Sequence, residues 1–385
     1  MKLIYADNNA TTQVDPVVLD EMLPCLKDQY GNPSSMYTLA ETSASKISEA
    51  RKRVARLIGA TCEEIIFTSC GTESNNAAIR SAIYTQPQKK HIVTTRVEHP
   101  AITHLCETLA KNGYRVTFVP VDKKGRLDLD YLKKNLSEQT ALVSVMWANN
   151  ETGVIFPIAE IAALVRKKGI LFHTDAVQAV GKIPLSVMGG GVDLLSFSGH
   201  KIHAPKGIGV LFVRKGTPFS PFLIGGHQEK NRRAGTENVA SIVALGKACE
   251  LAGEHLAEMN TRVKRMRDRL ETELLQRIPQ SEVNGDRLTR IPNTTNIGFS
   301  SIEGEAILLM LNELGVCASS GSACTTGSLE PSHVLRAMKV PMTSAHGSIR
   351  FSLSTANQEE DIDYIIEHLP RIVAKLRDWS PFWKK

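Results

Sequence analysis

The sequence predicts an α/β protein with a mainly parallel sheet and a second, smaller α+β domain. In the middle of the chain, short apolar segments alternate with amphipathic ones such as Pro100 to Lys111 and Ile158 to Lys168. That alternation is typical of parallel strands connected by helices. With 385 residues, of which 42% are hydrophobic, the chain can bury a large core, divided between about two domains.

Seven segments have the length and apolar character of buried strands. The expected strands are residues 65–68, 91–95, 115–119, 141–147, 170–174, 194–198 and 208–213. Sheets of this kind bind ligands beyond the carboxyl ends of their strands. We therefore expect a seven-stranded sheet with the functional residues along that edge.

A long helix is expected after the sheet, because apolar residues recur at helical spacing from Leu256 to Leu274. It would link the large domain to the small one, and its apolar stripe would belong to the core or to a dimer contact. We expect the large domain to span residues 16–257. The small domain would combine residues 1–15 with residues 258–385.

Composition argues against several classes of protein. The formal charge is only +6, and the Lys and Arg residues are spread along the chain, which gives nucleic-acid binding little support. Seven cysteines without regular spacing argue against a disulfide framework and for a reducing compartment. Residues 1–12 have no signal-peptide pattern, and no apolar run approaches membrane-spanning length. We expect a cytoplasmic enzyme.

Lys201 is the first candidate for chemistry. It follows the apolar segment 193–198 and precedes a glycine-bearing segment, so it would project from a turn beyond a buried strand. Desolvation there would lower its pKa and make it a nucleophile. Asp175 ends another apolar segment, and a nucleophilic lysine with a buried acid is the pair that pyridoxal phosphate (PLP) requires. Taken singly, Lys201 could be a solvated surface lysine and Asp175 a helix N-cap.

A third element favours the cofactor reading. After the strand-like residues 64–69, the chain turns through Cys70, Gly71 and Thr72 into a helix beginning near Asn75. Glycine permits close backbone approach, and a helix N-terminus presents free N–H groups to a phosphate. Ser198 and His200, which flank Lys201, can supply further donors.

Ten segments match one family in order along the chain. They are residues 7–12, 30–35, 68–74, 98–100, 149–153, 173–178, 198–201, 232–238, 319–328 and 348–353. On these motifs the sequence resembles the class V aminotransferases, which are PLP enzymes of fold type I, and within them the cysteine desulfurases. It is most similar to the nitrogen-fixation type, through residues 224–238, 303–311 and 380–385. The housekeeping iron–sulfur assembly type is close in motif and stays open as an alternative.

The resemblance implies roles for the matching residues. Lys201 would bond to the cofactor aldehyde, Asp175 would pair with the pyridinium nitrogen, and His99 would stack on the ring and assist proton transfer. Gln178 would hydrogen-bond the phenolic oxygen, and Asn150 would lie beside the ring. The phosphate would be held by Gly71, Thr72, Ser198 and His200, and by Thr236 of the neighbouring subunit in a homodimer with shared active sites.

Arg350 is a candidate for binding substrate. In the strand-like residues 348–353, alternation places Ile349 and Phe351 on one face and Arg350 on the other. A packed strand would hold the guanidinium as a rigid fork that suits a carboxylate, although a structural salt bridge is the alternative. The resemblance implies that Arg350 binds the α-carboxylate of L-cysteine, with Asn32 nearby.

Cys324 stands among small and polar residues in 319–328, so we expect an accessible thiol on an exposed loop. The resemblance makes it the nucleophile that takes the substrate sulfur as a persulfide and passes it to an iron–sulfur scaffold protein, leaving L-alanine. The other cysteines are expected to pack as small apolar residues: Cys25, Cys62, Cys70, Cys106, Cys249 and Cys317.

Other functions remain open at this point. An aminotransferase or a selenocysteine lyase would share Lys201 and Asp175. A noncatalytic sulfur-carrier partner would be expected to have a degraded lysine or phosphate site, and both are intact. His200 and His203 could suggest a metal site, but no acidic or thiol ligand is suitably spaced, so no metal is expected.

Overall fold

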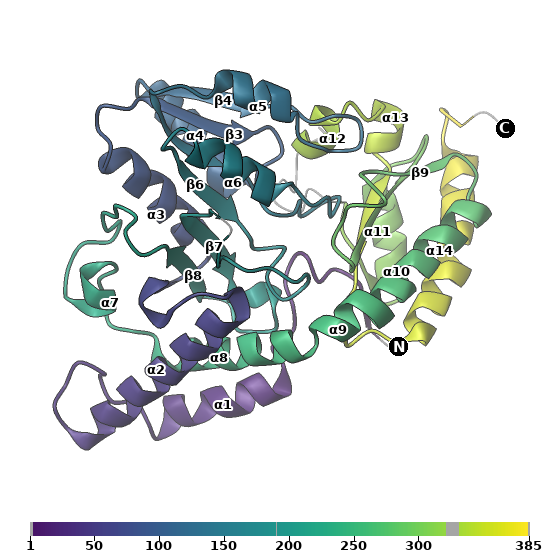
Figure 1. Ribbon diagram of the computed structural model, residues 1–385. Coiled ribbons are helices and arrows are strands. Elements are labelled where there is room, and N and C mark those ends of the chain that lie inside the picture. Colours follow the sequence, from purple (N-terminus) through teal and green to yellow (C-terminus); the bar gives the residue numbers. More distant parts are fainter. Residues whose placement is uncertain (1–2, 190, 321–330, 384–385) are drawn as a thin grey trace.

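The computed structural model describes residues 3–189, 191–320 and 331–383. Its largest element is a seven-stranded sheet in the order β2-β8-β7-β6-β5-β3-β4 (Figure 1). Every neighbouring pair is parallel except the two that include β8. The strands are β2 (Ile65–Thr68), β3 (His91–Thr95), β4 (Arg115–Val119), β5 (Thr140–Ser144), β6 (Leu171–Asp175), β7 (Leu194–Ser198) and β8 (Gly209–Val213). The mainly parallel sheet predicted from the sequence is confirmed.

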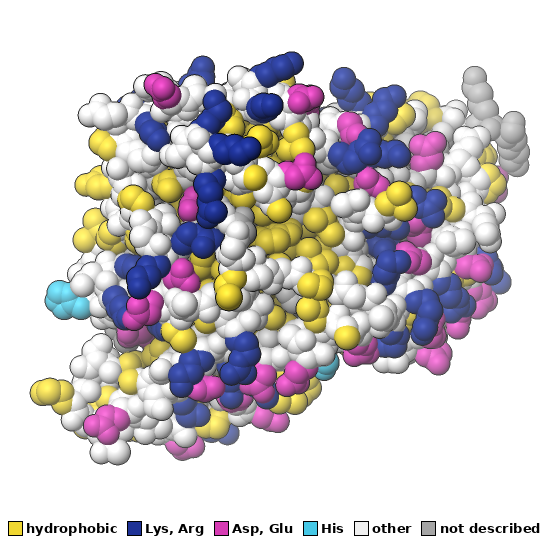
Figure 2. Space-filling model, viewed as in Figure 1, with side chains coloured by type: hydrophobic (Ala, Val, Ile, Leu, Met, Phe, Trp, Pro, Cys, Tyr) yellow, Lys and Arg dark blue, Asp and Glu magenta, His cyan; other side chains and the backbone are white. Residues whose placement is uncertain are grey.

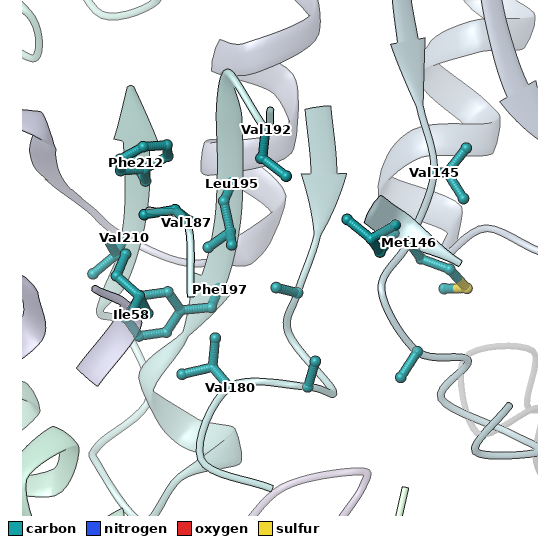
Figure 3. Packing of buried hydrophobic residues seen from close by; sticks show 14 of the residues in the cluster. Ile58, Val145, Met146, Val180, Val187, Val192, Leu195, Phe197, Val210 and Phe212 are labelled. Carbon is teal, nitrogen blue, oxygen red and sulfur yellow. The ribbon is translucent and has the colours of Figure 1, made fainter. Parts of the chain in front are cut away.

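Helices cover both faces of this sheet, as alternating strand side chains require. One face packs apolar residues against α3 (Gly71–Tyr84) and α4 (Pro100–Lys111). The other packs against α2 (Thr38–Ile58), α6 (Ile158–Arg166) and α8 (Val239–Glu254). On that second face, Ile58 packs with Phe197 and Val210 (Figure 3). The remaining helices of this part are α1 (Pro16–Lys27), α5 (Leu129–Asn135), α7 (Gln228–Asn231) and the short 3₁₀ turns Cys62–Glu64 and Gly199–Lys201.

The smaller part of the molecule has its own sheets and its own core. Strands β9 (Ser281–Val283), β10 (Thr294–Phe299) and β12 (Ser348–Ser352) are antiparallel in the order β12-β10-β9. Strand β1 (Ile4–Tyr5) pairs in parallel with β11 (Val316–Cys317), so the N-terminal segment adds to this part. Its helices are α10 (Lys264–Arg277), α11 (Gly304–Glu313) and α14 (Glu359–Trp379). The short helices α12 (His333–Ala337) and α13 (Met342–Ala345) lie between them in sequence, but their buried apolar residues Val334, Leu335 and Ala345 join the large core.

The connection between the two parts departs from the expected regular helix. It consists of α9 (Leu256–Glu258), a π-helix at Met259–Val263, and α10. Its apolar stripe lies in the small core, where the buried members are Met259, Val263, Met266, Leu270 and Leu274. Of the two roles that the sequence left open for the stripe, the described structure shows core packing.

The surface and the cysteines add two observations. Lys and Arg side chains are interspersed with Asp and Glu over the face drawn in Figure 2. Among the described residues, no helix combines the length and the apolar character needed to cross a bilayer. Cys25, Cys106 and Cys249 are buried as expected, whereas Cys62, Cys70 and Cys317 keep part of their surface exposed.

Candidate active site

The predicted cofactor elements meet at the carboxyl ends of β2, β6 and β7. Asp175 ends β6, Ser198 ends β7, and Gly71 begins α3 just after β2. A Cβ atom on Gly71 would lie 3.0 Å from Val177 Cγ2 and 3.5 Å from Ser198 Cβ. The glycine therefore lets the turn after β2 pack closely against the segments that follow the other two strands.

The N-terminus of α3 forms an anion-binding turn. Cys70 has an extended backbone and caps the helix, with its Sγ accepting from the Glu73 N–H at 3.5 Å. The first-turn N–H groups, which include those of Gly71 and Thr72, have no partner within the helix. Glu73 is engaged elsewhere, because its carboxylate pairs with Arg233 at 2.9 Å and accepts from the Ser69 N–H. The turn thus has the donors that a phosphate needs.

Asp175 is fixed by two donors. Its Oδ2 accepts from Asn75 Nδ2 at 2.7 Å, and its Oδ1 accepts from the Val177 N–H at 2.9 Å. The side chain is buried at the strand end. Asn75 was missed by the sequence reasoning, although it stands in the first turns of the helix that carries the phosphate site.

His99 caps α4 and lies within the electrostatic reach of Asp175 and Lys201. Burial lowers the pKa of His99, and the Lys201 charge lowers it further, while Asp175 acts in the opposite direction. Its Nδ1 accepts from the Ala101 N–H at 3.1 Å, which places the proton of a neutral ring on Nε2. The ring can therefore offer a proton from Nε2.

Lys201 is held by the N-terminal segment. Its Nζ donates to the carbonyl oxygens of Asn9 at 2.6 Å and Ala10 at 2.7 Å. The Asn9 carbonyl also accepts from Gln178 Nε2 at 2.9 Å. The Asn9 carbonyl thus connects Lys201, which the sequence assigned to the cofactor aldehyde, with Gln178, which it assigned to the phenolic oxygen.

Arg350 enters the site from the small sheet. As expected for β12, Ile349 and Phe351 lie in the core, and Arg350 is on the opposite face. Its Nη2 pairs with Asp7 Oδ1 at 2.6 Å, and its Nη1 donates to the carbonyl oxygen of Asn150 at 3.0 Å. Its Nε has no hydrogen-bond partner among the described residues. A buried guanidinium with a spare donor suits a substrate carboxylate.

Asn150 takes part through its main chain. Its carbonyl oxygen accepts from Arg350 and also from Asn9 Nδ2 at 3.2 Å. Asn9 therefore contacts Gln178, Lys201 and the Asn150 carbonyl that also holds Arg350. Asp7 and Asn9 were missed as site residues, and the only signal was their place in the first family motif.

Basic side chains of the site lower one another's pKa. Burial lowers the pKa of His200 to about 4, and the charges of Lys201, Lys206 and Lys182 contribute in that order. Lys182 is completely buried, and its pKa is lowered well below the usual lysine value by burial and then by Lys201 and Arg350. Lys201 and Arg350 are the cationic groups of the site that suit an anionic cofactor or an anionic substrate group.

Two predicted residues lie apart from this cluster within one chain. Asn32 is exposed between α1 and α2, where its Oδ1 accepts from the Ser34 N–H. Figure 1 shows that connection at the opposite end of the molecule from the small domain that carries Arg350. Thr236 is also exposed and lines a separate cavity with Ser69 and Gly207.

The remaining sequence assignments concern a thiol and a metal. Cys324 lies outside the described residues, so its prediction is untested by the structure. Within the described ranges, no cluster of three His, Cys, Asp or Glu side chains could hold a metal ion. His200 Nδ1 contacts Thr11 Oγ1, and His203 Nδ1 contacts the Gln13 carbonyl oxygen.

Comparison with known proteins agrees with this geometry. The family model described as Aminotransferase class-V matches residues 4–365. A cysteine desulfurase from Nostoc sp. is 59% identical over 99% of this chain and 96% of its own, and the cysteine desulfurase NifS from Azotobacter vinelandii is 55% identical over 99% and 95%.

Solved structures give the same result. A NifS-like protein superposes with a TM-score of 0.92 at 38% identity, covering 97% of this chain and 100% of that one. A structure described as SspA in complex with cysteine has a TM-score of 0.81 at 32% identity and covers 91% and 98%. The family resemblance seen in the sequence is confirmed: this chain belongs to the class-V aminotransferase family.

Proposed function

We propose that this chain is a PLP-dependent cysteine desulfurase, which converts L-cysteine to L-alanine and takes the sulfur as a persulfide on Cys324. The observation that carries the proposal is the convergence of Lys201 and Arg350 on one hydrogen-bonded network through Asn9 and Asn150. That network joins a nucleophilic amine to a carboxylate-binding guanidinium. Relatives named cysteine desulfurase cover nearly the whole chain.

The residues present fit PLP. The phosphate would be held by the anion-binding turn, the ring nitrogen by Asp175, and the aldehyde by Lys201. Bound PLP would supply an electron sink for negative charge at the substrate α-carbon. The close packing at Gly71 and the N–H groups at the start of α3 agree with a phosphate-bearing cofactor.

The side chains have distinct tasks in this proposal. Arg350 binds the substrate carboxylate, with its Nε and the fork shared with Asp7. His99, neutral and protonated on Nε2, would lie beside the cofactor ring and would assist proton transfer to the substrate. Lys201 Nζ, as the neutral amine, would accept the proton from the substrate α-carbon. Cys324 would attack the substrate sulfur as a thiolate, because a thiol is a poor nucleophile. The new S–S bond would form as the Cβ–S bond breaks, and the electron pair of the broken bond would stay on the substrate carbon, which takes up a proton on the way to alanine.

The test is to incubate purified protein with PLP, L-cysteine and a thiol reductant, and to quantify alanine and sulfide together. Equal amounts of both are expected, and Cys324→Ala should bind PLP yet form almost no alanine. Alanine formation by Cys324→Ala at the wild-type rate would instead favour a lyase or an aminotransferase. No alanine from wild type carrying PLP would refute the proposal.

We further propose a cytoplasmic homodimer that delivers sulfur to an iron–sulfur scaffold, for nitrogenase maturation. The identity to NifS of Azotobacter vinelandii supports the nitrogenase assignment over a housekeeping role. Asn32 lies in the connection at the far end of the molecule from the small domain, and Thr236 lines a separate cavity. Both residues are exposed, which suits residues that contribute to the active site of a neighbouring subunit.

Mixing Lys201→Ala subunits with Thr236→Ala subunits tests the shared site. Each mixed dimer should contain one sound site, so part of the activity should return after subunit exchange. No recovery after verified exchange would contradict the shared site.

A further inference from the structure

Lys182 is a buried amine placed directly behind the candidate active site. It lies seven residues after Asp175, at the end of the turns that follow β6, and its side chain is only 3% exposed. Gly181 precedes it with φ of 74°, and a Cβ there would meet Ile202 at 2.9 Å and Ala252 at 3.0 Å. The chain is therefore tightly fixed where it directs Lys182 inward.

Both partners of the Lys182 amine are amide oxygens. Its Nζ lies 2.5 Å from Gln178 Oε1 and 2.8 Å from Asn9 Oδ1. Within the described part of the chain, Lys182 forms no salt bridge with a carboxylate, and the charges that act on it come from Lys201 and Arg350. Burial of an amine without a carboxylate partner is costly, and the hydrogen bonds to the two amide oxygens offset part of that cost.

The donor character of Lys182 determines the direction of the Gln178 amide. An amide can be turned over in its site, because its oxygen and nitrogen ends have the same shape. Since Lys182 donates, the oxygen end of Gln178 faces it, and Nε2 faces the Asn9 carbonyl, which also receives Lys201 Nζ. One N–H of Gln178 Nε2 then remains for an acceptor in the site.

The same amine holds Asn9. The Asn9 side chain accepts from Lys182 through Oδ1 and donates through Nδ2 to Asn150 O and to Thr294 Oγ1 at 2.8 Å. Its carbonyl is thereby aimed at Lys201. A network of this kind, with its members satisfied, specifies one arrangement of the groups that it joins.

We propose that Lys182 is a positioning residue that acts through Gln178 and Asn9. It orients Gln178 so that an N–H of its side chain faces the site, and it fixes Asn9 so that its carbonyl oxygen faces Lys201. This inference rests on the proposed PLP function, in which that N–H meets the phenolic oxygen of the cofactor. Lys182 itself contacts neither cofactor nor substrate in this proposal.

The experiment compares PLP binding by apoprotein variants, followed by absorbance in a titration. Lys182→Met keeps the length and removes the donor, and it should weaken PLP binding about tenfold, as the loss of one well-made hydrogen bond does. The pH dependence of the visible band should shift as well, because the phenolic oxygen loses a donor. Lys167→Met, at an exposed lysine of the same domain, is the matched control and should change neither property.

A double-mutant cycle identifies the route of the effect. In a Gln178→Ala background, Lys182→Met should weaken PLP binding by less than about threefold, because the amide that it orients is already gone. Unchanged PLP affinity and an unchanged visible band in Lys182→Met would overturn the inference. So would a full effect in the Gln178→Ala background, which would assign Lys182 a purely structural role.

Two further measurements keep the test decisive. If Lys182→Met does not fold, Lys182→Gln retains an N–H donor in the same place and should bind PLP more tightly than Lys182→Ala; equal affinities would contradict the proposal. If wild-type apoprotein gains no visible band with PLP, the proposed function itself fails. A wild-type band with an insensitive Lys182 variant would contradict only the inference.

Discussion

Two buried glutamates, one in each part of the molecule, are stabilised differently. Glu98 in the large part accepts from the Met146 N–H at 2.9 Å and from Thr95 Oγ1 at 2.8 Å, and its Oε2 has no partner among the described residues. Glu271 in the small part pairs with Arg290 at 2.6 Å and with Arg287 at 2.9 Å.

The difference appears in their pKa values. Burial raises the pKa of Glu98 to about 8, and two neutral donors do not compensate. Burial also acts to raise the pKa of Glu271, but its bonds to Arg290 outweigh burial and lower the pKa. The large part thus keeps an acid protonated beside His99, whereas the small part balances opposite charges.

Breaking the small-part ion pair should have the largest effect on stability. Glu271→Ala removes the closest partner of the buried Arg290 and leaves it only Asp268 at 3.8 Å, which should cost about 3–5 kcal/mol of the free energy of unfolding. Urea unfolding measures it. Glu273→Ala, which removes a more exposed pair with Arg277 on the same helix, is the control and should cost below about 1 kcal/mol. Equal costs for the two would show that burial does not matter here.

Arg350→Ala should come next. The loss of a charge-assisted contact to the substrate carboxylate, worth about 1.5–3 kcal/mol, should lower kcat/KM for cysteine by roughly 10- to 150-fold, mainly through KM. Steady-state kinetics at saturating PLP measure it. Arg277→Ala, on the exposed face of α10, should leave KM unchanged. A fall confined to kcat would argue against carboxylate binding.

Glu98→Gln should change how stability depends on pH. Because the folded pKa of Glu98 is raised to about 8, the bound proton stabilises wild type fully below the unfolded pKa, and this stabilisation is lost as pH rises through 8. The wild-type free energy of unfolding should therefore fall by up to about 1.4 kcal/mol per pH unit relative to the variant. Unfolding at about pH 5.5 and about pH 7.5 tests this slope, and Glu305→Gln, at an exposed site, should show none.

Thr95→Val should have the smallest effect. It removes one neutral donor to Glu98 while keeping the shape of the side chain, so the cost should be about 1 kcal/mol. It should also raise the pKa of Glu98 further, which moves the pH-dependent loss of stability to higher pH. An unchanged pH profile would show that the Thr95 hydroxyl does not control this acid.

Local sequence patterns located the sheet well but not all of its limits. Residues 65–68, 91–95, 115–119 and 194–198 form the predicted strands, because each apolar run ends at a polar or turn residue. β5 ends at Ser144 rather than at residue 147, although Val145 and Trp147 still donate to the carbonyl oxygens of His173 and Asp175 in β6. The π-helix at Met259–Val263 also escaped prediction, because the apolar residues from Leu256 to Leu274 keep the spacing of an ordinary α-helix in the sequence.

For the site, the sequence located the residues whose motif has a local cause. Asp175 and Ser198 end strands, and Gly71 and Lys201 follow shortly after strands, all positions that local patterns indicate. The supporting contacts depend on chain crossings that no local pattern contains: Lys182 meets Asn9 across 173 residues. Residue type alone could not distinguish that buried lysine from an exposed one.

The N-terminal segment, which holds Lys201 through Asn9 and Arg350 through Asp7, has a consequence for folding during synthesis. Asp7 and Arg350 are 343 residues apart. At ribosomal rates, β12 is therefore synthesised roughly 20–70 s after the N-terminal segment. The large sheet can form in that interval, but Lys201 and Arg350 cannot yet belong to one hydrogen-bonded network, because Arg350 has not been made. The substrate site should therefore be complete only after β12 has emerged from the ribosome, whereas the residues proposed to hold the cofactor are all made earlier.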